Sequence, residues 1–226
     1  MSRIIRSLIG ISVVALSLVL VSQSSNISSA NSSYYRSLAQ LFTQDENSQP
    51  STENLQLAKI QIDRALSELP NDPNHLTTAG RITYLLAINE EQDEDRYDLL
   101  ELSKQLHIRA LDQRPYWAYS EINILFAMHL LGEHNSDFQN RFSRAMSLAP
   151  EDKRALIDLS EISVMSWPHL TKDNQQAALK LLEDVLIHNI QPTRTLALSL
   201  RQHNRFYQIC AQLTQFPEKK ALCNSY

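Results

Sequence analysis

The sequence predicts an all-α protein built from antiparallel helical hairpins. Only three glycines occur in 226 residues, and the first, Gly10, lies in an apolar N-terminal segment. The other two, Gly80 and Gly132, are too few for the turns of a β-sandwich, a barrel or a doubly wound sheet. The chain is rich in Leu, Ala, Gln and Glu, which favour helices. Its length suits one domain with a sizeable core and a short appendage.

A motif that recurs three times orders these helices. Each copy reads Arg-Ala-Leu or Arg-Ala-Met, and a proline follows four residues after the Leu or Met; the copies begin at Arg64, Arg109 and Arg144. The small Ala lets a helix pack closely against its neighbour, and the proline ends the helix because it has no N–H to donate. The last two copies lie 35 residues apart (144 − 109), close to the 34-residue period of tetratricopeptide hairpins. We therefore expect a tetratricopeptide-like array behind one N-terminal membrane helix.

The N-terminal segment predicts export from the cytoplasm. Residues 7–21 are uncharged and mostly apolar, Arg3 and Arg6 precede them, and no further Lys or Arg occurs before Arg36. With the two isoleucines before it, the stretch reaches the roughly 17–25 residues that span a bilayer. The two arginines are expected to remain on the cytoplasmic side.

The chain accordingly divides into three parts. Residues 1–21 are expected to be a single-pass membrane anchor; the alternative is a signal peptide cleaved after Ala30, which yields a secreted form. Residues 22–33 are mostly Ser and Asn, have little to bury and predict a flexible tether. Residues 34–226 are expected to be the helical-repeat domain, in the periplasm.

The apolar spacing predicts the helices of this domain in order. The first is expected at residues 34–42 and the second at 53–69, where apolar residues recur at i, i+3, i+4 and i+7. Asp72 can cap the next helix, with Pro73 at its first position. Later helices are expected at residues 96–113, 116–131, 136–149, 150–164, 171–190, 193–203 and 205–213, with a short turn at 217–223. Short loops between roughly ten helices predict antiparallel pairing.

Charge excludes one class of partner. The net charge is −4 and the pI about 6.0, with both signs dispersed, so no nucleic-acid partner is predicted. The exception is the acidic run at residues 90–95. Carboxylates favour the first turn of a helix, so we interpret this run as a solvated loop that leads into one. A docking patch for a cationic partner is the alternative.

Catalytic motifs are absent from the sequence, and we predict neither an enzyme nor a cofactor. There is no G-x-S-x-G elbow and no glycine-rich phosphate loop. His129 and His134, with Glu133, form the only local histidine cluster. A step of five residues would rotate the two rings apart on a helix, so we interpret them as surface histidines rather than metal ligands.

Two further groups of residues stand out. Arg114, Tyr116, Trp117 and Tyr119 are candidate binding residues, because aromatic rings in a groove can stack on sugars; the competing interpretation is that the rings open a helix and pack against the previous hairpin. Cys210 and Cys223 are expected to form a disulfide in an oxidising compartment, contributing about 3 kcal/mol by closing the loop. Two free buried thiols are the alternative.

The stretch Arg-Pro-Tyr-Trp-Ala-Tyr at residues 114–119, the helix that follows it, Arg144-Ala145 and Trp167-x-x-Leu170 together resemble the VpsP-type accessory proteins of bacterial polysaccharide biosynthesis. The resemblance covers about residues 100–190 and the N-terminal segment. Ala118 departs from it, because it stands where the family's second proline is expected.

The resemblance implies a membrane-tethered periplasmic scaffold that assists the biosynthesis or export of a surface polysaccharide. Its partners would be other polysaccharide-assembly proteins, bound through a concave hairpin face. One alternative is a glycan-binding or glycan-cleaving protein that uses the aromatic residues with a carboxylate such as Glu121. Another is a general envelope assembly scaffold.

Overall fold

The computed structural model describes the backbone of residues 3–41, 50–149, 152–187 and 193–212, and the side chains of these residues except 3–17, 187, 193–195 and 206. Over these ranges the chain forms ten α-helices and one short 3-10 helix, and no strand. The all-α class predicted from the sequence is therefore confirmed.

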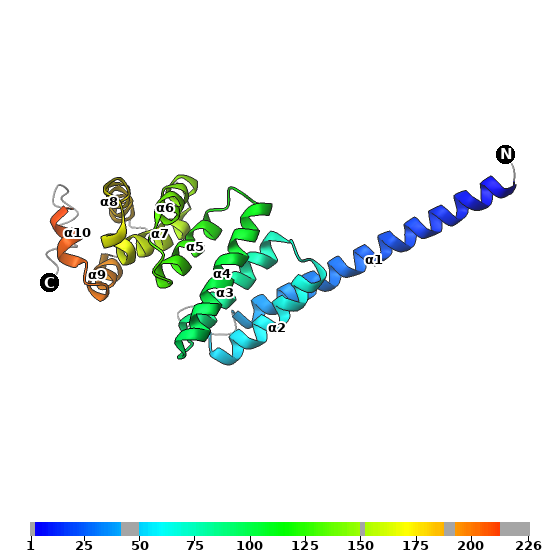
Figure 1. Cartoon of the computed structure of the whole chain (residues 1–226), viewed down its shortest axis with the longest axis horizontal. Coiled ribbons are helices and arrows are strands. Elements are labelled where there is room, and N and C mark those ends of the chain that lie inside the picture. The colour runs from blue at the N-terminus through cyan, green and yellow to red at the C-terminus, as the bar shows by residue number, and fades with distance from the viewer. Residues whose placement is uncertain (1–2, 42–49, 150–151, 188–192, 213–226) are drawn as a thin grey trace.

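The helices pack as sequential antiparallel pairs, stacked in chain order (Figure 1). The 3-10 helix η1 (Trp167–His169) joins the two members of the fourth pair. The pairs are α1 (Arg3–Leu41) with α2 (Thr52–Glu68), α3 (Pro73–Ile88) with α4 (Asp93–Gln113), α5 (Ala118–Leu130) with α6 (Ser136–Leu148), α7 (Lys153–Ser166) with α8 (Lys172–Ile187), and α9 (Thr193–Gln202) with α10 (Phe206–Gln212).

The recurring motif places its side chains as its spacing predicts. All three alanines of the motif are at most 1% exposed; they are Ala65, Ala110 and Ala145. The motif arginines have a role that the sequence did not reveal. Arg109 donates to the carbonyl oxygen of Pro70 at 2.8 Å, and Arg144 donates to that of Pro115 at 2.6 Å. Each arginine therefore binds the proline that ended the preceding copy, which ties successive hairpins together.

The residue two positions after each motif proline immediately precedes the first helix of the next hairpin, at the N-cap position. Asp72 accepts hydrogen bonds from two N–H groups at the start of α3, and Asp152 does the same for α7. Such caps satisfy donors that have no partner within the helix. At the equivalent position before α5 stands Trp117, whose side chain makes no capping hydrogen bond. The middle copy has an aromatic ring in place of a cap.

Buried apolar side chains form two clusters along the stack. The smaller one lies among α2, α3 and α4, with α1 side chains against it. The larger one begins at Leu111 near the end of α4 and continues through α5 to α10. Phe138 and Phe142 of α6 are its largest fully buried side chains. α5 contacts both α3 and α7, so the first helices of three successive hairpins lie next to one another.

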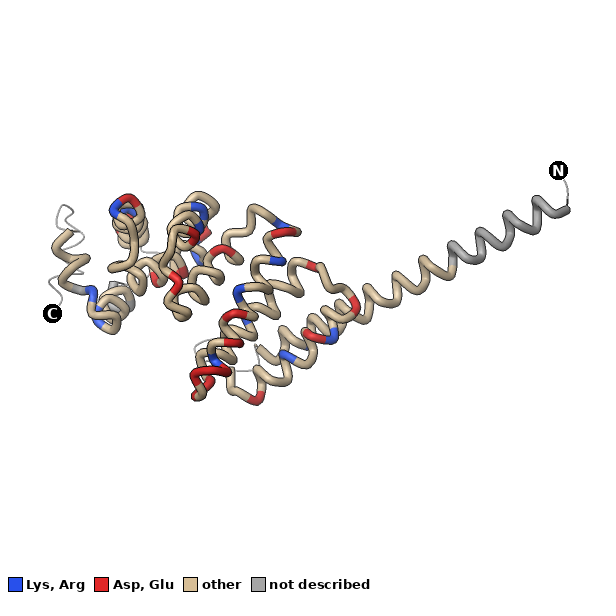
Figure 2. The backbone as a smooth tube through the Cα atoms, viewed as in Figure 1, with Lys and Arg blue, Asp and Glu red and all other residues tan. Residues whose placement is uncertain are grey.

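The start of α4 confirms the interpretation of the acidic run. Residues 90–92 form a loop, and Asp93, Glu94 and Asp95 make up the first turn of the helix. An ion pair joins Asp93 to Arg96 one turn later. Figure 2 shows these carboxylates gathered at the start of α4, whereas positive and negative residues are interspersed along the other described helices.

The expected flexible tether is wrong as a description of residues 22–33. These residues are helical, and α1 continues without a break to Leu41, so the helix expected at 34–42 is the end of a much longer one. Ser and Asn favour helices only weakly, but at the C-terminal end of this stretch tertiary packing overrides the preference. Ala30, Ser33 and Ser37 are buried against α2, where small side chains allow a close approach, and Ser29 donates to Glu68 at 2.8 Å.

No helix that is long and apolar enough to cross a membrane occurs among the described residues. The expected anchor comprises residues 1–21, and the structure does not describe the side chains of residues 1–17. It stays a prediction.

Candidate functional site

The candidate binding residues lie together where α4 connects to α5: three are in the connection, and Tyr119 is in the first turn of α5. The Arg114 guanidinium carbon lies 4.6 Å from the centroid of the Trp117 ring, and Arg114 also donates to Asn74 of α3 at 3.4 Å. The Trp117 ring is half-buried against the core, 5.6 Å from the ring of Tyr119. Tyr116, by contrast, is 82% exposed. The connection thus combines two packed rings, one cation and one free ring.

Tyr119 links this connection to the next hairpin. Its hydroxyl donates to Oδ1 of Asp152 at 2.8 Å. Partial burial and this carboxylate raise the pKa of Tyr119 to about 12. The N–H of Ala155 and the Tyr119 hydroxyl lower the pKa of Asp152, which caps α7. The geometry supports the packing interpretation for Trp117 and Tyr119 and leaves Tyr116 available to a ligand; glycan binding itself stays a prediction.

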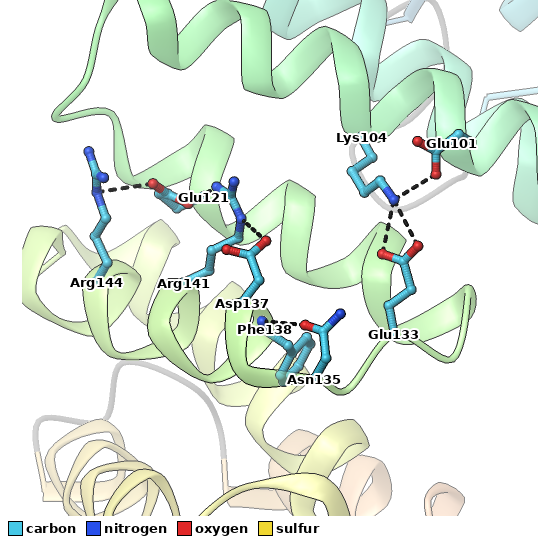
Figure 3. A network of polar contacts seen from close by, with 9 residues as sticks. All are labelled: Glu101, Lys104, Glu121, Glu133, Asn135, Asp137, Phe138, Arg141 and Arg144. Atoms are coloured by element: carbon cyan, nitrogen blue, oxygen red, sulfur yellow. Dashed lines mark hydrogen bonds and ion pairs between the residues drawn. The ribbon is translucent and has the colours of Figure 1, made fainter.

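Glu121, the carboxylate considered for glycan cleavage, lies buried between two arginines of α6 (Figure 3). One carboxylate oxygen accepts a hydrogen bond from Arg141 at 2.9 Å. The other lies 3.0 Å from Nε of Arg144, an ion pair without good hydrogen-bond geometry. Arg141 also binds Asp137 at 2.9 Å. The Glu121 side chain is 1% exposed, and with both oxygens facing guanidinium groups it gives no geometric support to a cleavage role.

The first helices of three hairpins present a face that the sequence did not single out. We call it the inner face and define it by Arg81 and Tyr84 of α3, Phe126 of α5, and Asp158 and Glu161 of α7. The rings of Tyr84 and Phe126 meet with centroids 6.1 Å apart. All five side chains keep some exposure to solvent, and Arg81 and Glu161 are exposed.

The ionisable groups of the inner face are nevertheless desolvated by the protein around them. Desolvation lowers the pKa of Arg81 and raises the pKa values of Asp158 and Glu161. Burial, and then the charge of Glu161, raise the pKa of Tyr84 to about 12. Charges on α7 therefore act on side chains of α3 across the intervening α5.

The histidine pair was misinterpreted from the sequence. His129 and His134 do not share one helix, because α5 ends at Leu130 and Gly132 turns the chain with a φ of 75°. The turn brings Nδ1 of His129 to 3.0 Å from Nε2 of His134. His134 in turn stacks on His169 of η1, with ring centroids 3.8 Å apart. A glycine at the end of a predicted helix was the signal that could have warned of this reversal.

A shallow hollow of about 530 Å³ runs between α1 and α2. It is lined mainly by serine hydroxyls, with Arg36 and Arg64 on its walls. In the described part of the chain, no group of three or more His, Cys, Asp or Glu side chains is arranged to hold a metal ion.

Of the two cysteines predicted to pair, only Cys210 can be placed. It lies buried in α10. Cys223 lies outside the described residues, so the disulfide stays a prediction.

Comparison with known proteins gives no relative from which a function could be transferred: no family model, no curated protein and no solved structure matches the chain.

Proposed function

We propose that the chain is a tetratricopeptide-like periplasmic scaffold, tethered to the inner membrane by its N-terminal segment. It assists the biosynthesis or export of a surface polysaccharide by binding other assembly proteins. The link to polysaccharide comes from the resemblance of residues 114–119 and the helices after them to VpsP-type accessory proteins.

The observation that best supports a binding role is the inner face. Arg81 and Glu161 are desolvated, accessible and without an ion-pair or hydrogen-bond partner among the described residues. Exposed charges that have no partner within the chain are available to complementary charges of a binding partner, which steer and orient its association. The adjoining Tyr84–Phe126 ring pair supplies the aromatic area that is typical of interface centres.

The experiment is site-specific photocrosslinking of the full-length chain in native membranes. A benzoylphenylalanine in place of Tyr84 is expected to give one discrete adduct containing a polysaccharide-assembly protein. The matched control is the same residue in place of Tyr97 on α4, an exposed tyrosine outside the inner face, which is expected to give none. Equal labelling from both positions, or unchanged surface polysaccharide in cells that lack the chain, would contradict the proposal.

A second candidate function is glycan binding at the α4–α5 connection, and the exposure of Tyr116 favours it. An exposed ring beside the Arg114–Trp117 stack has the amphipathic surface on which sugars pack. Tyr116→Ala should then weaken binding of the purified polysaccharide by about tenfold, or about 1.4 kcal/mol, at an unchanged melting temperature. Tyr207→Ala, which removes an equally exposed ring from α10, serves as the control. Identical titrations for both variants would exclude this function.

A further inference from the structure

Three imidazoles meet where the third hairpin joins the fourth. His129 lies near the end of α5, His134 in the turn to α6, and His169 in η1. Nδ1 of His129 lies 3.0 Å from Nε2 of His134 and 2.9 Å from the hydroxyl of Ser166 in α7. The rings of His134 and His169 are stacked, with an angle of 8° between their planes. We call these three residues the histidine cluster.

The surroundings of the cluster favour its uncharged form. Phe138 of α6 packs edge-on against His134, and Ser166 contributes only a hydroxyl. His203 and Arg205, which follow α9, add positive charge rather than negative. The neighbouring carboxylate, Glu133, binds Lys104 of α4 through both oxygens at 2.9 Å, as Figure 3 shows. Every charge identified as acting on His129 or His134 is cationic or belongs to another imidazole.

The contact between His129 and His134 cannot persist when both imidazoles are protonated. A neutral imidazole has one N–H and one lone pair, so the contact between His129 and His134 requires a lone pair on one of the two facing nitrogens. If both rings were protonated, two N–H groups would face each other at 3.0 Å. Burial and the neighbouring histidines lower the pKa of His129 to about 4, and burial followed by His169 lowers the pKa of His134. In the folded chain, His129 and His134 therefore stay neutral at pH values at which free imidazoles are protonated.

The cluster lies on the joint between the two hairpins. Gln139 of α6 donates to the carbonyl oxygen of His169 at 2.8 Å and accepts from the N–H of Thr171 at 3.1 Å. It also binds Asn174 of α8 through its side chain and its backbone. Together with the rings, these bonds hold η1 against the α5–α6 turn. Repulsion within the cluster would act directly on this contact.

We propose that the histidine cluster is an acid-sensitive joint: as the pH falls from about 7 to about 5, protonation of its imidazoles releases η1 from the α5–α6 turn and loosens hairpins α7–α10 from hairpins α1–α6. The proposal is independent of the scaffold function. It concerns the relation between two halves of the stack, whichever partner either half binds.

Hydrogen–deuterium exchange of the purified full-length chain tests it. After correction for the intrinsic pH dependence of exchange, protection of residues 128–140 and 164–172 should fall by about tenfold between pH ~7 and ~5, and this fall should depend on the imidazoles of the cluster. His134→Phe keeps a ring against Phe138 and His169 but cannot bind a proton, so it should abolish most of this loss. His75→Phe, which removes a buried histidine outside the joint, should leave the loss unchanged.

A second measurement does not depend on the folding of any variant. In the wild-type chain, NMR titration of the imidazole protons should show His129 and His134 neutral to below about pH 6, with curves that depend on each other. Independent curves centred near 6.5, or a loss of protection at these residues that His134→Phe leaves unchanged, would overturn the proposal.

Discussion

Two adjacent hairpins bury a polar side chain in opposite ways. In the α5–α6 hairpin, Glu121 has no exposed carboxylate oxygen, yet each oxygen faces an arginine. In the α3–α4 hairpin, His107 is completely buried, and neither ring nitrogen has a hydrogen-bond partner. His107 stands two residues before its motif arginine, and the other two copies have Ile62 and Phe142 at that position. The repeat therefore does not require a polar side chain there.

The comparison shows that the effect of a buried polar group on the free energy of unfolding depends on whether the group has a partner. A paired buried charge becomes costly when its partner is removed, whereas an unpartnered buried group is costly as it stands. Gly80 explains why an imidazole fits in α4 at all. A Cβ at Gly80 would lie 2.6 Å from Nε2 of His107, so only glycine leaves room for the ring.

The largest expected effect comes from removing a partner of Glu121. Arg141→Met should lower the free energy of unfolding by about 3 kcal/mol, because it leaves a buried carboxylate with one cation instead of two. Chemical denaturation measures this directly. Lys59→Met, which breaks an ion pair with the exposed Asp63, should cost less than about 1 kcal/mol. Equal losses in the two variants would show that burial does not distinguish the pairs.

The next prediction concerns the space that His107 occupies. Gly80→Ala should destabilise the protein by about 2 kcal/mol through overpacking, and His107→Ala in the same chain should restore part of that loss. A double-mutant cycle measures this coupling. Gly132→Ala is the control. A Cβ there meets no atom within 4 Å, so its cost of about 1 kcal/mol comes from the positive φ alone, and His107→Ala cannot restore it. Additive losses at Gly80 and His107 would refute the close contact.

Replacing the unpartnered imidazole should stabilise the protein. His107→Leu is expected to raise the free energy of unfolding by about 1 kcal/mol at neutral pH, because it removes buried polar atoms that make no hydrogen bond. An unchanged or lower stability would mean that the ring nitrogens are satisfied.

The same variant should also alter the pH dependence of stability. Burial, with the charge of Arg81, lowers the pKa of His107 to about 3 in the folded chain, against about 6.5 when unfolded. Below pH 6.5 the unfolded chain binds a proton that the folded chain does not, so the wild type loses stability as the pH falls. The advantage of His107→Leu should therefore grow by about 1.4 kcal/mol per pH unit below ~6.5.

The smallest expected effect concerns a polar contact near the surface. Tyr119→Phe should cost about 0.5 kcal/mol, because water can replace the Tyr119 hydroxyl at Asp152. Asp152→Ala, which also removes the cap of α7, should cost about 1 kcal/mol. Thermal unfolding of both variants measures the order of the two effects, and a larger loss for Tyr119→Phe would reverse the interpretation of this bond.

The sequence predicted best where a pattern is local. Local signals in the sequence located both ends of α2 and α6, and the start of α3, within a residue or two, because capping and helix termination depend on neighbours in the chain. The continuation of α1 through residues 22–33 was missed for the opposite reason. Ser and Asn give no periodic signal, and the contacts that bury Ala30 and Ser33 against α2 join parts of the chain that are distant in the sequence.

The candidate site was predictable only in part. The cluster of aromatic residues was visible in the sequence, and its members do lie together. The two arginines around Glu121 lie 20 and 23 positions further on (141 − 121 and 144 − 121), and no local spacing connects them to it. The inner face likewise draws side chains from three hairpins. Such groupings depend on how the hairpins stack, which single-sequence periodicity does not specify.

The continuous α1 helix determines how the stack is held. A helix of 39 residues is about 58 Å long and comparatively stiff. A linker of random coil would let the hairpins rotate freely and vary their distance from the N-terminal end. A helix packed on α2 sets both the distance and the direction, so a tilt imposed at that end is transmitted to the first hairpin. A partner that binds the inner face is therefore held at a defined distance and orientation relative to the N-terminal end of α1.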